Sequence, residues 1–426
     1  MRARWIRRLL WVLGFGCLWL PLCDDPPLQT GSYLQDVRGD RATVAMITAG
    51  PELLRCEVRG ATGELVAELR SAAPARRHAF VAQGLQPGAT YDYAVLDAAG
   101  RRRDGGRFAT APADDAAPVR FAFLGDSGAV PAWVWLQTAP IGYLPAHWQW
   151  LPTRGEVTAI GARLAAFAPQ FVLHLGDVIY PNGRHAHYSA GFFRPFADVL
   201  RQAPIYPLLG NHDVMDADGL QLLANFHLPG SAATGDERQF SFAHGAVRVI
   251  CADLNTDYGA VPFGPEHPGY RFVATELASA TEPWVVVASH FPMRSASRQR
   301  DRGDLLLHLQ PLLERWGVDL YLSGHDHCYQ RYGHPEQGEL VQITSGGGGK
   351  SLYAVRPHAK AVVLASQFHW CSAVAADGQL LVKAHAQGGD LLDSVQLPLR
   401  SGGSLERLRE QNPARATRIE ALLRPR

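Results

Sequence analysis

Two histidines separated by one residue follow an apolar run in the last third of the chain. The run is DLYLSG at residues 319–324, and His325 and His327 come directly after it. If the backbone stays extended past Gly324, the two imidazoles lie on the same side, because alternate residues of extended backbone share a face. Two imidazoles on one face are arranged as metal ligands are.

Four other apolar runs also end in polar side chains. VRFAFLGDSG, FVLHLGDVIY, PIYPLLGNHD and PWVVVASHFP end, in turn, in Asp126, in Asp177 and Tyr180, in Asn211 and His212, and in His290. Each run has the length of a buried parallel strand, and open α/β sheets place their sites at the carboxyl ends of such strands. We therefore predict that five strand ends meet at one edge of a sheet.

These side chains are difficult to explain as packing. Two carboxylates, a phenol, an amide and three imidazoles at one sheet edge would leave buried charges unpaired, at a cost of several kcal/mol per ion. A cation removes this cost, and these donors suit first-row transition metals. The donors are numerous enough for two ions.

The ordered motifs GDSG, GDVIY, GNHD, ASHFP and GHDH resemble those of the metallophosphoesterase (calcineurin-like) superfamily, specifically its purple acid phosphatase branch. Calcineurin-like members have a DxH in the first motif, whereas here Asp126 is followed by Ser127 and Gly128. A tyrosine three residues after the second aspartate, Tyr180, stands in for the missing ligand. The resemblance extends from Asp126 to His327.

The resemblance implies a specific assignment of ligands. One metal would be held by Asp126, Asp177, Tyr180 and His327, and the other by Asp177, Asn211, His290 and His325. A phenolate favours Fe(III), and the amide and imidazole set accepts a divalent ion such as Zn, Mn or Fe(II). The expected reaction is hydrolysis of a phosphate monoester by a metal-bound hydroxide.

His212 has two candidate roles in that reaction. It could donate a proton to the leaving alkoxide, or it could orient the site through hydrogen bonds behind the ligands. Asp213 is expected to orient its neighbours. Purple acid phosphatases usually have a further histidine in the loop after the ASHFP-type motif, but the loop MRSASRQRDRG has none. Arg294, Arg298 and Arg300 are therefore the candidates for holding the phosphate.

Residues 130–151 form an insertion rich in tryptophan, with Trp133, Trp135, Trp148 and Trp150. They could form a lid that selects an aromatic or lipid-like leaving group, or a self-packed loop or dimer patch.

TSGGGGKS at 344–351 nearly matches a phosphate-binding P-loop, but Thr344 occupies the position of the first glycine. We interpret it as a flexible loop beside the site. GDSG also occurs around serine-protease nucleophiles, but only His78 precedes Ser127, so a triad is not expected.

The chain divides into four parts. Residues 1–28 have a basic start and a fifteen-residue uncharged stretch, which predicts a signal peptide and export, with an uncleaved membrane anchor or a lipoprotein as alternatives. Residues 29–112 show short alternating runs and a Pro-Gly turn before Tyr91 and Tyr93, which resemble a fibronectin type III domain. Residues 118–398 form the catalytic domain, and 401–426 a tail with arginines on a solvated face.

From residue 119 onward, apolar runs alternate with helical patterns, which indicates an α/β fold. The family resemblance adds two mixed sheets between helices, an α/β (α+β) four-layer sandwich. The stretches QFHWCSAVAA and LLVKAHAQ are expected at the closing edge of a sheet. Four cysteines outside the leader, Cys56, Cys251, Cys328 and Cys371, are interpreted as small apolar filling.

Composition limits the partners. The chain has 47% apolar and 19% charged residues and a formal charge of +1, and nothing in this balance indicates nucleic acid. The expected partner is a small-molecule phosphate ester. Three functions remain open: a phosphomonoesterase, a phosphodiesterase or nucleotide or phospholipid phosphatase at the same metals, and a non-catalytic surface binding protein. The oligomeric state is left open.

Overall fold

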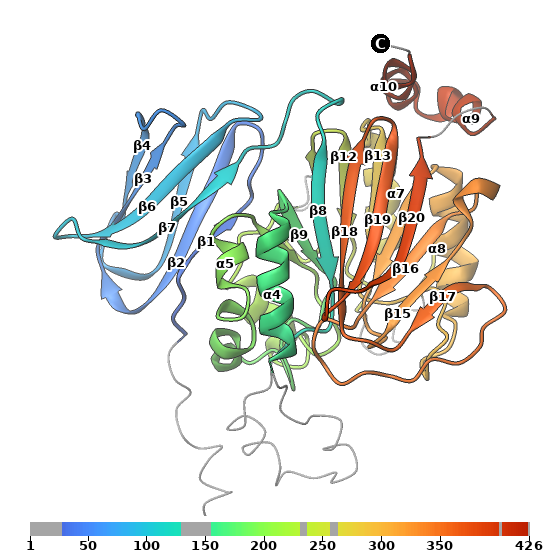
Figure 1. The fold of residues 1–426 in the computed structure, drawn as a ribbon, viewed down its shortest axis with the longest axis horizontal. Helices are drawn as coiled ribbons and strands as arrows, with labels where there is room; N and C mark the ends of the chain where they lie inside the picture. Colours follow the sequence, from blue (N-terminus) through green and yellow to red (C-terminus); the bar gives the residue numbers. More distant parts are fainter. Residues whose placement is uncertain (1–27, 129–154, 231–236, 256–262, 400–402, 425–426) are drawn as a thin grey trace, which may run out of the picture.

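A computed structural model describes residues 28–128, 155–230, 237–255, 263–399 and 403–424 (Figure 1). The predicted leader, apart from Leu28, and the whole tryptophan-rich insertion lie outside the described residues. The described strands form four sheets. Two small sheets are built from residues 32–109, and two larger sheets are built from residues 119–398.

The two small sheets pack face to face around a core of their own. One has the order β1-β2-β5 and the other β4-β3-β6-β7. Their inward side chains, among them Val44, Cys56 and Val95, form a single buried cluster. The strands are β1 (Ser32–Gln35), β2 (Arg41–Glu52), β3 (Leu54–Arg59), β4 (Leu65–Arg70), β5 (Ala75–Gln83), β6 (Thr90–Asp97) and β7 (Arg102–Ala109).

This β-sandwich is docked on the rest of the protein through β1 and its neighbours. The Tyr33 hydroxyl donates to the carbonyl of Asn225 at 2.8 Å, and the Gln35 amide donates to the carbonyl of Ile205 at 3.1 Å. Asp104 of β7 pairs with Arg201 at 3.0 Å. Buried, directional contacts of this kind hold the sandwich against the larger part of the chain (Figure 1).

The larger part is built on a six-stranded and a seven-stranded mixed sheet. Their orders are β10-β9-β8-β18-β19-β20 and β11-β12-β13-β14-β16-β15-β17. The first sheet contains β8 (Val119–Leu124), β9 (Phe171–His174), β10 (Ile205–Pro207), β18 (His369–Ala376), β19 (Gln379–Ala386) and β20 (Leu391–Pro398). The second contains β11 (Phe240–His244), β12 (Val247–Cys251), β13 (Trp284–Ala288), β14 (Leu320–Ser323), β15 (Tyr329–Tyr332), β16 (Val341–Ser345) and β17 (Ala361–Ala365).

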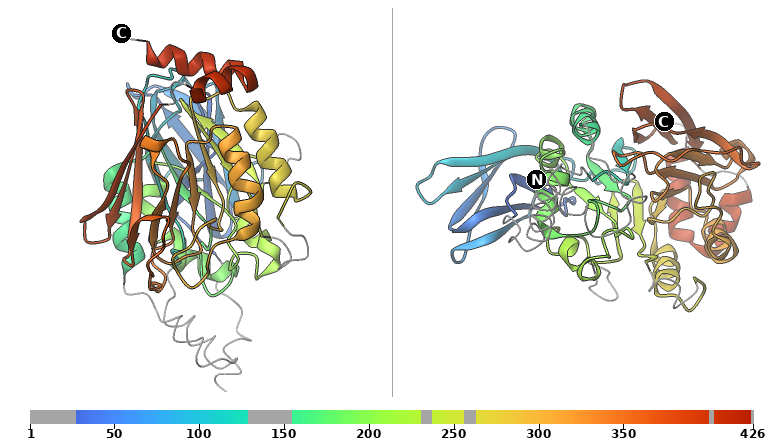
Figure 2. Two further views of the ribbon diagram at one scale, coloured as in Figure 1. Left: turned by 90° about the vertical axis from the view of Figure 1, so that its right-hand side faces the viewer. Right: turned by 90° about the horizontal axis from the view of Figure 1, so that it is seen from below.

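Helices cover the sheets from outside. Inward residues of both sheets share one core, which also includes Leu164 of α4. The opposite face of the seven-stranded sheet packs on Val273 of α7 and Leu309 of α8. Figure 2 (left) shows these two helices along that sheet. No helix among the described residues is long and apolar enough to cross a membrane. The α-helices are α4 (Glu156–Phe167), α5 (Ala197–Leu200), α6 (Leu220–Leu223), α7 (Pro268–Ser279), α8 (Gly303–Arg315), α9 (Gly403–Gln411) and α10 (Pro413–Leu423).

The five motif-bearing strands do not belong to one sheet. β8, β9 and β10 are parallel neighbours in the six-stranded sheet, whereas β13 and β14 are parallel neighbours in the seven-stranded sheet. The prediction of a single sheet edge is therefore wrong in this respect. The stretch QFHWCSAVAA was predicted at the closing edge of a sheet, and this is also wrong. It forms β18, which lies inside its sheet next to β8, whereas β20 forms the edge.

The C-terminal tail is also more deeply engaged than expected. Arg415 of α10 is buried and pairs with Asp319 at 3.0 Å. Its guanidinium also donates to the carbonyls of Glu282, Pro283 and Gly317, which precede β13 and β14. The prediction that the tail arginines lie on a solvated face is wrong for this residue. The four cysteines named above are free and buried, as predicted.

A buried histidine in the core predicts a specific acid sensitivity. His244 of β11 packs on the Phe171 ring at 5.2 Å, and its Nε2 has no hydrogen-bond partner among the described residues. Burial lowers the pKa of His244 to about 4. Because the unfolded chain takes up this proton near pH 6.5, stability present above that pH falls by about 3 kcal/mol as pH approaches 4.

We expect His244→Phe to remove this part of the acid sensitivity. Urea midpoints measured across this pH range for the wild type and the variant check it. The gap between them should widen in favour of the variant as pH falls. Parallel midpoints would show that His244 does not titrate on unfolding.

Candidate metal centre

The seven predicted ligands all lie just beyond strand ends. Asp126 follows β8, Asp177 and Tyr180 follow β9, and Asn211 follows β10, while His290 follows β13 and His325 and His327 follow β14. The six-stranded sheet therefore supplies the oxygen donors, and the seven-stranded sheet supplies the imidazoles. The side chains meet where the two sheets face each other.

The local backbone at three of these positions is left-handed. Asp126, Asp177 and His325 have φ values of 57°, 52° and 67°. Left-handed residues other than glycine are uncommon and cost of order 1 kcal/mol or more, so they persist where surrounding contacts hold them. The prediction that His325 and His327 share a face because they lie on extended backbone is therefore wrong. A tight turn directs them instead, with the Asp326 N–H donating to Gly324 at 2.8 Å.

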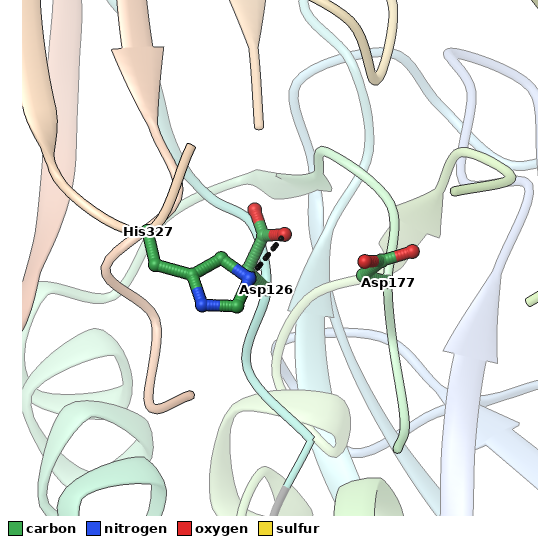
Figure 3. Close-up of side chains that lie close together, drawn as sticks. All are labelled: Asp126, Asp177 and His327. Carbon is green, nitrogen blue, oxygen red and sulfur yellow. Dashed lines mark ion pairs between the residues drawn. The ribbon is translucent and has the colours of Figure 1, made fainter. Parts of the chain in front are cut away.

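Tyr180 lies at the centre of the first group of donors. Its hydroxyl oxygen is 3.1 Å from Asp126 Oδ1, 3.0 Å from Asp177 Oδ2 and 3.2 Å from His327 Nε2. His327 Nε2 is 3.4 Å from Asp126 Oδ1 (Figure 3). Candidate ligand atoms of Asp126, Asp177 and His327 all lie within 4.8 Å of one another. Donors that are distant in sequence thus meet at metal-binding range.

A second group of donors lies on the other side of Asp177. Asn211 Oδ1 is 3.1 Å from His290 Nε2 and 2.9 Å from His325 Nδ1. His290 Nε2 is also 3.5 Å from Asp177 Oδ1. Asp177 therefore contributes one carboxylate oxygen to each group, which is the position that a bridging ligand requires.

Backbone carbonyls orient two of the imidazoles. His290 Nδ1 donates to the Leu175 carbonyl at 2.8 Å, and His327 Nδ1 donates to the Ser351 carbonyl at 2.7 Å. In the neutral rings, Nε2 then carries a lone pair directed into the cluster, as in metal-ligating histidines. Lone pairs of Nε2 and of carboxylate and amide oxygens facing one another repel unless a cation lies between them. The donor set therefore fits metal ions.

Two further carboxylates hold the ligand loops. Asp213 accepts from the backbone N–H groups of Val178 at 3.0 Å and Gly210 at 2.9 Å, and so ties the second motif to the third. Asp326 accepts from the Ser297 hydroxyl at 2.7 Å and the Gln330 amide at 2.7 Å. The orienting role predicted for Asp213 matches these contacts.

The electrostatics of the cluster also favour a cation. Burial raises the pKa of Asp126 well above its usual range. Burial acts on Asp177 in the same direction, but the neighbouring imidazoles of His290 and His212 outweigh it and lower its pKa to about 2. Burial, reinforced by Asp126 and Asp177, raises the pKa of Tyr180. A positive ion would stabilise all three deprotonated groups at once.

The predicted acid lies at the edge of the cluster. His212 Nδ1 donates to the Pro181 carbonyl at 2.8 Å, and Nε2 lies 3.9 Å from Asp177 Oδ2. The ring is 4.7 Å from that of Tyr180. The side chain keeps 17% of its surface exposed, so a bound ester could reach it.

The three candidate phosphate contacts are not placed together. Arg298 stacks on the Tyr353 ring at 4.1 Å, and Tyr353 stacks on His327, also at 4.1 Å. Arg294 instead turns to Gln310 of α8 at 3.2 Å. Arg300 is exposed and has a φ of 66°. Arg298 alone of the three is thereby tied to the cluster, and phosphate binding by Arg294 and Arg300 stays a prediction.

Sequence reasoning missed two groups beside the cluster. The Ser127 hydroxyl and His174 Nε2 are 2.7 Å apart, but both residues are fully buried and form part of the core. The second group is the glycine-rich stretch that was interpreted as flexible. Its Lys350 lies 5.0 Å from the centre of the Tyr180 ring, and its Ser351 carbonyl orients His327. Burial lowers the pKa of Lys350 to about 7.

Comparisons with known proteins find similar phosphoesterases. Residues 119–329 match the model of the calcineurin-like phosphoesterase family. Purple acid phosphatase 17 of Arabidopsis thaliana is 29% identical over 201 residues, 42% of this chain and 59% of the plant protein. Tartrate-resistant acid phosphatase type 5 of Rattus norvegicus is 28% identical over 289 residues, 62% of this chain and 81% of the rat protein.

A solved structure shares the fold over most of the chain. The purple acid phosphatase PPD1 from yellow lupin (Lupinus luteus) seeds superposes with a TM-score of 0.71 at 18% identity, over 88% of this chain and 75% of the lupin protein. Motif order, donor geometry, family match and fold agree. Residues 119–329 therefore form a calcineurin-like phosphoesterase domain, and the chain is similar in sequence to purple acid phosphatases and shares the fold of one of them.

Proposed function

We propose that this protein hydrolyses phosphate monoesters at a binuclear metal centre. The observation that carries the proposal is the convergence of two carboxylates, a phenol, an amide and three imidazoles, with the Tyr180 hydroxyl within 3.2 Å of Asp126, Asp177 and His327. Related acid phosphatases support the choice of phosphate esters. The donors would be surplus in a protein that only binds partners, so we favour catalysis over a non-catalytic role.

We infer that the ligands divide as the resemblance implies. Asp126, Asp177, Tyr180 and His327 would hold Fe(III), since carboxylates and a phenolate are hard donors. Asp177, Asn211, His290 and His325 would hold a divalent ion, Zn, Mn or Fe(II). When bound, the two ions would bind phosphate oxygens, offset their negative charge and acidify water.

The protein's own residues would carry the proton transfer. His212 lies at the rim, with Nδ1 fixed by the Pro181 carbonyl, so Nε2 is the atom that would give a proton to the leaving oxygen. Asp177 accepts from the His212 backbone N–H at 2.8 Å. This contact couples the position of His212, the proposed proton donor, to that of Asp177, the proposed bridging ligand. Arg298 donates to the Tyr353 hydroxyl at 2.7 Å, and we propose that it contacts the phosphate.

The alternative within hydrolysis is a phosphodiesterase, or a nucleotide or phospholipid phosphatase, at the same ligands. Turnover of matched monoesters and diesters by one metal-analysed preparation separates these functions. Faster turnover of diesters would replace the monoesterase proposal. No turnover of either class by a preparation with both metal positions filled would favour the non-catalytic role.

We also propose that residues 29–112 are a fibronectin type III-like spacer. Two observations support this: the sheet orders β1-β2-β5 and β4-β3-β6-β7, and the hydroxyl of Tyr91, near the start of β6, which accepts from the Gln86 N–H at 2.8 Å as in a tyrosine corner. Export, with the leader at 1–28, is proposed from the leader's basic start and uncharged stretch.

Tyr180 provides a spectroscopic test of the metal assignment. If its phenolate binds Fe(III), the iron-loaded protein should be coloured by a charge-transfer band, and Tyr180→Phe should bleach it. Visible absorption with iron analysis on both proteins measures this. Tyr188→Phe, which changes an equally buried tyrosine outside the cluster, should keep the band. A colourless wild type with full iron occupancy would refute the assignment.

His212 provides a kinetic test of the proton donor. We expect His212→Gln to lower kcat by roughly 10²–10⁴-fold for alkyl phosphates, whose leaving groups need a proton, and far less for p-nitrophenyl phosphate. Metal content should not change. His334→Gln, a change at an exposed histidine, is the control. An equal loss with both substrates would indicate that His212 positions Asp177 instead.

A further inference from the structure

The glycine loop, defined here as residues 345–351, lies along the loop that carries Asp126. The Gly125 N–H donates to the Ser345 carbonyl at 2.7 Å, and the Gly348 N–H donates to the Gly125 carbonyl at 3.0 Å. The Lys350 N–H then donates to the Asp126 carbonyl at 3.0 Å. Three backbone hydrogen bonds therefore fix the glycine loop against the first ligand, which corrects the interpretation of a flexible loop.

Side chains would prevent this approach. A Cβ atom at Gly346 would lie 2.2 Å from the Asp326 carbonyl oxygen, and one at Gly348 would lie 2.3 Å from the Gly125 carbonyl oxygen. Both contacts are with backbone atoms of ligand loops, which have little room to move. The glycines are thus explained by close packing against two ligand loops rather than by phosphate binding.

The glycine loop directs Lys350 toward Tyr180, one of the proposed Fe(III) ligands. Lys350 is 3% exposed, and its Nζ lies 5.0 Å from the centre of the Tyr180 ring. This is a cation–π arrangement. The next residue, Ser351, orients His327 through its carbonyl. One loop therefore touches three ligands of the same metal position: Asp126 through the backbone, His327 through a carbonyl, and Tyr180 through a charge.

A positive charge on the face of a phenolate ring stabilises the ring electrons. Those electrons are the ones that a phenolate shares with Fe(III) and that move to iron in the charge-transfer transition. Because the Lys350 ammonium lies over the ring, its charge would act directly on the ring electrons. The charge of Lys350 should therefore weaken electron donation from the Tyr180 phenolate to Fe(III) and raise the energy of the charge-transfer transition.

We propose that Lys350 is a positioning residue that acts through Tyr180, its ammonium group setting how strongly the phenolate donates to the iron. The proposal rests on the proposed function, because it takes Tyr180 as an iron ligand. It assigns to the glycine loop a role in tuning the metal, through a residue that is not itself a ligand.

The test compares iron-loaded wild type, Lys350→Met and Lys350→Arg at one fixed acidic pH. Lys350→Met removes the charge and keeps the length, and should shift the charge-transfer maximum to longer wavelength and the iron midpoint potential to a more negative value. Lys350→Arg should remain near the wild type in both. Lys360→Met, which removes an exposed lysine, should change neither. Visible spectra, redox titration and metal analysis provide the readouts.

Three results would overturn the proposal. The first is a wild-type spectrum and potential in an iron-loaded Lys350→Met protein. The second is an equal shift in Lys350→Arg, because shape rather than charge would then matter. The third is loss of iron from both variants, which would make Lys350 a support of the loop. A colourless wild type is a different result, since it would refute the binding of iron by Tyr180.

Discussion

Two buried carboxylates that both contact the Tyr180 hydroxyl are the constraint on which this structure depends. Asp126 is fully buried and Asp177 is 1% exposed, and the environment raises the pKa of the first and lowers that of the second. Nearby imidazoles and N–H groups offset part of the cost of two charges. Bound metal ions would offset the remainder, and the loops around the site hold the donors in place for them.

The composition of the site could be predicted because each donor follows its own apolar run. Residue type and distance from a strand end are local properties, so the sequence could place Asp126 and His327 together. In the structure, His327 Nε2 lies 3.4 Å from Asp126 Oδ1. Which sheet each strand joins is not local. Strand partners lie far away in the chain, as β8 and β18 do, and nothing near Asp126 indicates them. The left-handed backbone at three ligands was missed for a related reason, because it is imposed by packing.

Residues with distant partners account for most of the other corrections. Arg415 was expected in solvent, but it bonds to carbonyls and to Asp319, about a hundred positions earlier in the chain. The glycine loop resembles a mobile segment in composition, and its order becomes evident only from the carbonyls it meets. Glycine permits both flexibility and close approach, and the sequence does not distinguish them.

The distribution of donors links the metal centre to the packing of the whole domain. Carboxylates, phenol and amide come from the six-stranded sheet, and imidazoles come from the seven-stranded sheet. An ion bound by both sets connects the two sheets at one end. Arg415 acts at the opposite ends of β13 and β14. Because both sheets share one core, a shift of either sheet would change distances at the metals, so the packing itself determines the geometry in which the ligands meet.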